Sequence, residues 1–337
     1  MSEILIWIVK IAVIYGGLVG TAAAMSLAER KVSAWMQYRI GPNRVGPFGL
    51  LQPIADGIKF IFKEELVPDG ANKLLFRLAP AMAAFPAMLT IAVIPFGPTV
   101  TIAGHEVNLS IADLDIGILF VLAVGGLSIY GVILGGWASN SKYSLLGSLR
   151  ASAQMISYEL SMILAILAVV VLTGSLDLQQ IVASQATIGQ WNVFHQPLAF
   201  VLFVIATFAE TNRHPFDFAE CEPELVAGFH TEYSSMRFAL FFLGEYCAMT
   251  VMACLTVTLF LGGYSVPFAP EAHWAIGVLA FAVKTAFFLF LFLWVRWTLP
   301  RLRFDQLMRL GWKVMLPLAL VNILVTGIAV SLGVELW

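Results

Sequence analysis

Long apolar runs separated by short polar segments dominate the chain. Eight of these runs suit membrane spans, because a helix of about 20 apolar residues matches the hydrocarbon thickness of a bilayer. They lie at roughly 4–28, 75–97, 116–138, 154–173, 196–210, 238–262, 275–297 and 314–334. The fifth run is short, and the second contains prolines, which neighbouring helices in a membrane accommodate. The pattern predicts an all-α integral membrane protein with about eight transmembrane helices, forming a single membrane domain over residues 1–337.

The polar segment at 29–65 contains a second kind of periodicity. Ile54, Ile58, Ile61 and Phe62 fall on one helical face, and charged residues fall opposite. This pattern predicts an amphipathic helix on the cytoplasmic side, lying along the membrane surface or against a partner. The GPNRVGPFG stretch before it lacks the Gly-Lys-Ser/Thr ending of a phosphate-binding loop, so nucleotide binding is not expected.

Basic residues predict the orientation of the spans. Of 19 lysines and arginines, 17 lie in or beside the loops that follow odd-numbered spans, whereas the loops at 98–115, 174–195 and 263–274 contain none. Because basic loops stay in the cytoplasm, both termini are expected on the outer, periplasmic side. The predicted cytoplasmic loops lie near 29–74, 139–153, 211–237 and 298–313.

The composition argues against several classes of partner and cofactor. Hydrophobic residues make up 60% of the chain and charged residues 12%, against about 25% charged residues in an average globular protein. A net charge of −2 argues against a nucleic-acid partner. The three cysteines form no CxxC motif, and the five histidines lie in loops or at span ends, so no metal, haem or iron–sulfur ligands are expected.

Acidic residues are concentrated between residues 210 and 233, although the whole chain has only 21. The six carboxylates of this segment are Glu210, Asp217, Glu220, Glu222, Glu224 and Glu232. A solvated cytoplasmic loop and a proton relay both fit such a cluster. Phenylalanines among the acids, and the bends at Pro215 and Pro223, favour a relay. Carboxylates held close together at low dielectric raise one another's pKa, as a relay requires.

Glu159, Glu245 and Lys284 are further charged residues within predicted spans. Glu159 and Glu245 lie about 7–10 Å from the cytoplasmic side, and Lys284 lies about 20 Å deep. A charged group at the bilayer centre costs about 2.5–3.5 kcal/mol on insertion scales, so each should face protein or a water-filled cavity. A structural ion pair, or a hydrogen-bonded neutral acid, is the alternative to a functional role.

Two motifs give the chain a family resemblance. ERKxxAxxQxRxGPNxVGxxGLLQPxADxxK spans Glu29 to Lys59, and ETNRxPFDxxExExELVAGFxxEYS spans Glu210 to Ser234. Together they resemble the H subunit of bacterial respiratory complex I, the proton-pumping NADH:quinone oxidoreductase. The resemblance covers essentially the whole chain and agrees with the eight predicted spans.

The resemblance implies a membrane-arm subunit of that enzyme, without a redox cofactor of its own, whose cytoplasmic side forms much of a quinone chamber. It also implies a line of buried carboxylates that couples quinone reduction to proton translocation. The implied chamber residues are Arg30, Arg39, Asp56 and Phe229. The implied proton-coupling residues are Glu159, Glu210, Asp217, Glu220, Glu222, Glu224 and Glu245, and the implied charge-balancing residues are Arg150, Arg213 and Lys284.

Partners and location follow from the same resemblance. Ubiquinone or menaquinone is expected as substrate at a subunit interface. The expected neighbours are peripheral-arm subunits that carry the terminal iron–sulfur cluster, small membrane subunits, antiporter-like subunits and the lipid bilayer. A bacterial inner membrane is the expected location, before a mitochondrial one.

Three alternatives stay open at the level of sequence. The first is a related subunit of a membrane-bound hydrogenase. The second is a free-standing proton-coupled transporter, which predicts an inverted repeat that the chain does not clearly show. The third is a purely structural membrane anchor.

Overall fold

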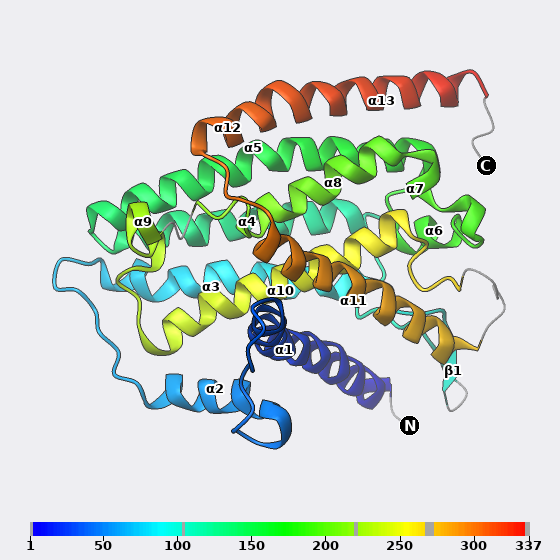
Figure 1. Cartoon of the computed structure of the whole chain (residues 1–337). Coiled ribbons are helices and arrows are strands. Elements are labelled where there is room, and N and C mark those ends of the chain that lie inside the picture. The colour runs from blue at the N-terminus through cyan, green and yellow to red at the C-terminus, as the bar shows by residue number, and fades with distance from the viewer. Residues whose placement is uncertain (1–2, 103–104, 219–221, 267–272, 334–337) are drawn as a thin grey trace.

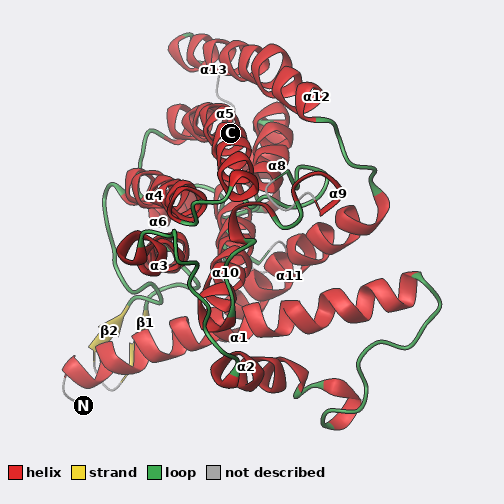
Figure 2. Cartoon of the chain, turned by 90° about the vertical axis from the view of Figure 1, so that its left-hand side faces the viewer, coloured by secondary structure: helices red, strands yellow, loops and turns green. Residues whose placement is uncertain are grey.

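The computed structural model describes residues 3–102, 105–218, 222–266 and 273–333, and long helices make up most of it. Figure 1 shows α3, α4, α5, α8 and α13 side by side, with α1 and α11 crossing at an angle. The long helices are α1 (Glu3–Met36), α3 (Lys73–Thr90), α4 (Gly117–Ala138), α5 (Lys142–Thr173), α8 (Pro197–Glu210), α10 (Ser235–Phe260), α11 (Trp274–Thr298) and α13 (Leu316–Ser331). Viewed from the side, α3, α4 and α5 are stacked next to α10 (Figure 2).

Short elements connect and extend these helices. They are α2 (Gln52–Phe62), α6 (Leu178–Ala183), α7 (Asn192–His195), α9 (Glu222–Leu225), α12 (Phe304–Arg309), a π-helix at Leu310–Met315, and 3₁₀ turns at Pro47–Gly49, Ile91–Val93, Ile188–Gln190 and Gly228–His230. In the described part of the chain, the strands are β1 (Val100–Ile102) and β2 (His105–Val107), which pair antiparallel with Val100 opposite Val107.

The helices confirm the predicted all-α membrane fold. Among the described residues, seven helices are long and apolar enough to cross a bilayer, when α12, the π-helix and α13 are counted as one. The short fifth run forms α8, whose 14 residues span about 21 Å. Because a bilayer core is about 30 Å thick, α8 does not cross it alone. Its last residue, Glu210, therefore comes to lie inside the protein, where it is 8% exposed.

Two helices extend well beyond the predicted spans. α1 continues into the first sequence motif and ends at Met36, and α5 begins at Lys142, within a predicted loop. A prediction from hydropathy places the end of a span where charged residues begin. The Ala, Leu, Arg, Lys and Ser residues there favour or tolerate a helix, so the helix continues beyond the apolar run.

Close contact between α3 and α4 depends on Gly131. A Cβ at Gly131 would lie 2.3 Å from the backbone nitrogen of Ala83 and 2.7 Å from the carbonyl carbon of Met82. Pro86 lies one turn further along α3 and cannot donate the usual hydrogen bond to the Met82 carbonyl. The two helices thus meet where α3 contains proline and α4 contains glycine.

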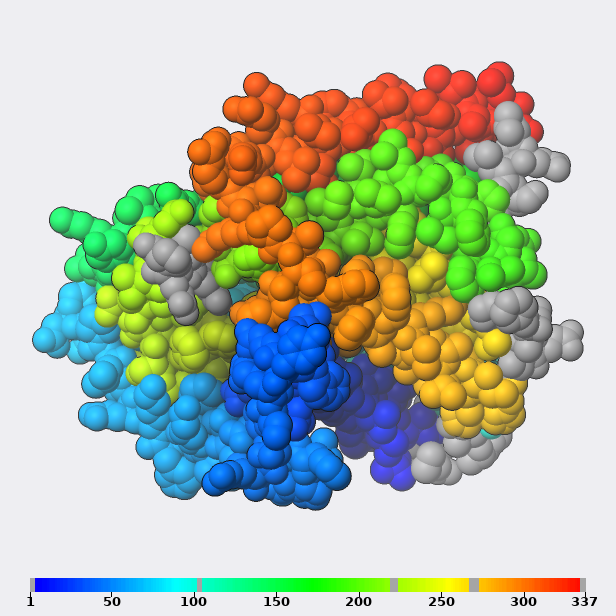
Figure 3. Space-filling view, viewed as in Figure 1, coloured from blue at the N-terminus to red at the C-terminus, as the bar shows by residue number. Residues whose placement is uncertain are grey.

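α2 confirms the predicted amphipathic helix. No residue of α2 is buried, and Ile54, Ile58, Ile61 and Phe62 are between 50% and 85% exposed. The helix lies at the edge of the molecule below the long helices, and its blue atoms form part of that lower edge (Figure 3). Its apolar face is available to lipid or to a partner.

The α3–α4 contact leads to a stability prediction. Gly131→Ala should destabilise the detergent-solubilised protein by about 1–3 kcal/mol, because the added methyl group overlaps backbone atoms that cannot rotate away. Gly125→Ala, in the same helix, is the matched control, since a Cβ there meets no atom within 4 Å. The measurement is the midpoint of thermal unfolding, and equal midpoints for the two variants would show that α3 and α4 do not need this close approach.

Candidate functional site

Arg213 is the centre of a buried cluster of ion pairs. It lies in the turn after α8 and is only 4% exposed. Its Nη1 is 3.1 Å from Oε2 of Glu29, and its Nε forms an ion pair with Glu245. Its guanidinium also lies 4.6 Å from the centroid of the Tyr246 ring, a cation–π contact. These contacts join the turn after α8 to α1 and α10.

Glu29 has partners on both carboxylate oxygens. The hydroxyl of Tyr246 donates to Oε2 at 2.8 Å, and Arg296 of α11 pairs with Oε1. Two glutamates thus balance two arginines within what we call the Arg213 cluster (Glu29, Arg213, Glu245, Tyr246 and Arg296). Burial alone lowers the pKa of Arg213, but the carboxylates of Glu245 and Glu29 outweigh burial, so the pKa is raised and Arg213 stays charged.

Sequence reasoning missed Glu29, Tyr246 and Arg296 as site residues. Glu29 is 184 residues from Arg213 and 217 residues from Tyr246 in the sequence, and no local sequence pattern shows such contacts. One signal was available. Glu29 ends the first apolar run, as Glu210 ends the fifth, and both runs end on the predicted cytoplasmic side.

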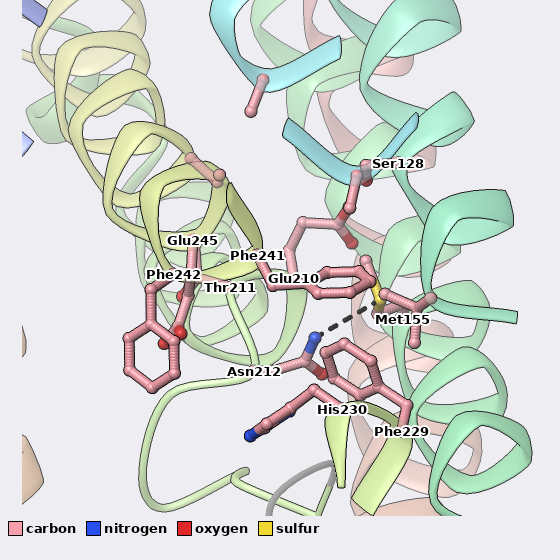
Figure 4. Close-up of a pocket in the computed structure, with 15 residues that line it drawn as sticks. Ser128, Met155, Glu210, Thr211, Asn212, Phe229, His230, Phe241, Phe242 and Glu245 are labelled. Atoms are coloured by element: carbon pink, nitrogen blue, oxygen red, sulfur yellow. Dashed lines mark hydrogen bonds between the residues drawn. The ribbon is translucent and has the colours of Figure 1, made fainter. Parts of the chain in front are cut away.

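A cavity of about 70 Å³ adjoins the Arg213 cluster, and we call it the acid cavity. Its wall includes Glu245 of α10, Glu210 at the end of α8, Ser128 of α4, and Phe229 and His230 of the 3₁₀ turn. Figure 4 shows Glu210 between Glu245 and Ser128. Two of the predicted carboxylates therefore line the same space.

Glu210 is held at this position by α5. The amide of Gln154 donates to the carbonyl of Ala209 at 2.9 Å and to the side chain of Asn212 at 3.2 Å. Asn212 also contacts the sulfur of Met155 at 3.5 Å, the dashed line in Figure 4. Oε2 of Glu210 is buried and has no hydrogen-bond partner in the described part of the chain. A buried carboxyl oxygen in that situation needs water or a proton.

A second, smaller cavity of about 20 Å³ also adjoins Glu210. We call it the inner cavity, and Glu159 of α5 and Glu210 both line it. Its other side chains are apolar, including Val121, Phe203 and Met252. Glu210 lines both cavities. Glu245 also lines the acid cavity, and Glu159 also lines the inner cavity.

The rest of the acidic segment lies nearer the surface. Nη1 of Arg150 is 2.5 Å from Oε2 of Glu224, whose side chain is 54% exposed. Asp217 lies in the loop before α9, close enough to His214 to affect its pKa, although burial is the larger cause and lowers it. The predicted residue Glu220 and the side chain of Glu222 lie outside the described part of the chain.

The predicted chamber residues fall into two places. Arg30 and Asp56 form an ion pair of 2.8 Å that joins α1 to α2, and Gln52 donates to the same aspartate at 3.1 Å. Nε of Arg39, in the exposed turn after α1, donates to Gln37 at 2.6 Å. Phe229 instead lines the acid cavity and packs edge-on against Phe241.

Lys284 has a different kind of partner from the one expected. Its ammonium donates to the carbonyls of Leu261, Gly263 and Ser265 at 2.7, 3.0 and 2.8 Å. It also lies 4.5 Å from the centroid of the Trp191 ring. These carbonyls end α10 and the turn after it, where unpaired carbonyls attract a cation. The structure therefore places Lys284 at the C-terminal end of α10, whereas the Arg213 cluster contacts α10 near its middle, at Glu245 and Tyr246.

His230 adds no positive charge to the acid cavity at neutral pH. It is 5% exposed, and burial lowers its pKa to about 4. In the part of the chain that the structure describes, no three histidine, cysteine, aspartate or glutamate side chains are grouped so that they could hold a metal ion. The chemistry of this site is that of carboxylates and arginines.

The Arg213 cluster leads to a stability prediction. Glu29→Gln should destabilise the solubilised protein by about 3–5 kcal/mol, because it leaves buried Arg213 and partly buried Arg296 to share one carboxylate. The control is Asp305→Asn, which breaks an exposed pair with Arg303 and should cost under about 1 kcal/mol. Thermal unfolding midpoints compare the two variants. If both variants unfolded at the same temperature, Glu29 would have no anchoring role.

Known proteins match this sequence over nearly its whole length. The family model described as NADH dehydrogenase matches residues 9–327. An H subunit of the NADH-quinone oxidoreductase of Geobacter metallireducens, the copy numbered 1, is 58% identical over 325 residues, which is 96% of each chain. An H subunit of the same enzyme from Geobacter sulfurreducens, the copy numbered 2, is 58% identical over 318 residues, or 94% of each chain. The H subunit of Leptospira biflexa is 50% identical over 348 residues, covering 99% of this chain and 97% of that one.

The match confirms the resemblance carried by the two sequence motifs. It extends through every helix that contributes to the Arg213 cluster and to both cavities. The chain therefore belongs to the NADH dehydrogenase family, together with the H subunits of bacterial NADH-quinone oxidoreductases.

Proposed function

We propose that this chain is a membrane-arm subunit of bacterial complex I that forms part of a quinone chamber and couples quinone reduction to proton translocation. Two relatives that carry the name of this enzyme align over 94% or more of both chains. In this proposal, partner subunits carry the flavin and the iron–sulfur clusters, and small membrane subunits and antiporter-like subunits complete the membrane arm. The complex would lie in the bacterial inner membrane, with ubiquinone or menaquinone as substrate at the subunit interface.

The observation that carries the coupling role is the position of Glu210. Its side chain borders both the acid cavity and the inner cavity, between Glu245 and Glu159. Each cavity leaves room for water, and water joining polar groups can pass protons between them. A proton that reaches Glu245 could therefore pass to Glu210 and then to Glu159. Reduction of a quinone to a neutral quinol takes up two electrons and two protons, so residues that supply those protons change their charge next to such a line.

Arg213 supplies the fixed positive charge beside this line. When Glu245 takes up a proton, its ion pair with Arg213 weakens, and Arg213 keeps Glu29 as its partner. Arg213 thus stays at its place while Glu245 changes charge. We assign Arg213 and Arg150 to charge balance, and Asp217, Glu220, Glu222 and Glu224 to the cytoplasmic mouth of the line.

We assign the quinone chamber to the region where α1 meets α2. The Arg30–Asp56 pair fixes the angle between these helices and offers polar groups to a quinone head group. The exposed apolar face of α2 next to it, with Ile54 and Ile58, suits an isoprenoid tail or the membrane surface. Arg39 in the following turn belongs to the same region, and contact of Phe229 with quinone stays a prediction.

The three carboxylates provide the main test. In the assembled complex, Glu159→Gln, Glu210→Gln and Glu245→Gln should each lower quinone reduction coupled to pumping by about tenfold to hundredfold, because an amide cannot relay a proton. NADH oxidation by an artificial acceptor should be unchanged. The matched control is Glu232→Gln, an acid of the same segment that is not part of either cavity wall. Full coupled activity in all three variants would contradict the relay.

The chamber assignment has its own test. Arg30→Ala and Asp56→Asn should each raise the apparent KM for quinone by about tenfold, because either change removes a charged hydrogen-bonding partner. The two residues are paired, so the double variant should be little worse than either single one. Arg303→Ala, which breaks an exposed pair, serves as control. Unchanged quinone kinetics in both single variants would remove the pair from the chamber.

A further inference from the structure

The carboxylate of Glu159 lies against bare backbone on α4. A Cβ at Gly126 would lie 3.1 Å from Oε1 of Glu159, closer than side-chain carbons normally approach an oxygen. No other heavy atom outside the local backbone would lie within 4 Å of that Cβ. The carboxylate thus occupies the space that a side chain at position 126 would take.

We infer that Gly126 is a positioning residue for Glu159. Because position 126 has no side chain, Glu159 lies against α4 and faces the inner cavity that it shares with Glu210. The inference rests on the proposed function, since it deepens the role of Glu159 in proton coupling. Neither sequence motif includes Gly126, so the motifs gave no reason to select it.

The walls of the inner cavity make the placement matter. Glu159 and Glu210 are the polar side chains of this wall, and its remaining side chains are apolar. A buried water needs two to four polar partners, so the partners here are these carboxyls and any exposed backbone. Gly126 leaves its backbone uncovered beside Oε1 of Glu159. A methyl group there would cover that backbone and push the carboxyl away from α4.

The expected effect is moderate, because the carboxyl has a cavity to move into. A shift of a few tenths of an ångström relieves a contact at 3.1 Å. Misplacement by about 1 Å costs on the order of a hundredfold in well-ordered sites, so a smaller shift should cost about three- to tenfold. Gly125 precedes Gly126 in α4 and also lines the inner cavity, but a Cβ there meets no atom within 4 Å, so it adds a methyl group to the same wall without touching Glu159. The two glycines form a matched pair.

The experiment compares Gly126→Ala with Gly125→Ala in the assembled complex. Gly126→Ala should lower coupled quinone reduction by about three- to tenfold, and Gly125→Ala should stay within about twofold of the unmodified enzyme. NADH oxidation by an artificial acceptor reports intact assembly in both. Glu159→Asp shortens the side chain by one methylene, so adding Gly126→Ala to Glu159→Asp should cost less than about twofold.

A spectroscopic measurement keeps the test independent of activity. An infrared difference spectrum of the unmodified complex contains carboxyl C=O bands. The band that is missing in Glu159→Gln is assigned to Glu159. That band should shift in Gly126→Ala and stay unchanged in Gly125→Ala. The inference is overturned if the two glycine variants have the same rate and the same band position. It is also overturned if Gly126→Ala lowers the activity of the Glu159→Asp enzyme by the same factor as that of the unmodified enzyme. Failure of the proposed relay would show differently, as full coupled activity in Glu159→Gln.

Discussion

The buried charge of Arg213 is the constraint on which the rest of this structure depends. A guanidinium that is 4% exposed in an apolar protein must be paired, because an unpaired buried charge costs several kcal/mol. Its partners are a glutamate of α1 and a glutamate of α10, and Arg296 of α11 holds the first of these. Helices that are far apart along the chain therefore have to meet at one point. The acid cavity adjoins that point because Glu245 belongs to both.

The short α8 explains why a second carboxylate joins the first. A helix of 14 residues ends within the depth of a bilayer core, and its last residue here is Glu210. Gln154 of α5 fixes this end by bonding the carbonyl of Ala209. Glu210 thus lies in the walls of both cavities, the first of which Glu245 also lines and the second of which Glu159 also lines.

The sequence predicted the parts of the fold that local pattern determines. Apolar run length predicted the membrane helices, and periodicity predicted α2 with its exposed apolar face. Resemblance pointed to Glu210 and Glu245, which the structure places around one cavity. The partners of these acids were not predictable, because helix rotation and long-range packing decide them. The same is true of Lys284. The sequence predicted its depth in the membrane, but its contacts with three carbonyls depend on where α10 ends.

The two glutamates that pair with Arg213 have different contacts, and these contacts suit them to different roles. Both oxygens of Glu29 are engaged, by Arg213 and Tyr246 on one side and by Arg296 on the other. Protonating Glu29 would weaken three contacts and loosen α1, α10 and α11 together. Glu245 pairs with Arg213 and also faces the acid cavity, so its protonation leaves the Glu29 contacts in place. An arginine shared between one saturated and one accessible carboxylate can keep its position while the accessible one changes charge. In the proposed function, therefore, Glu29 is assigned the anchoring of the helices and Glu245 the exchange of a proton.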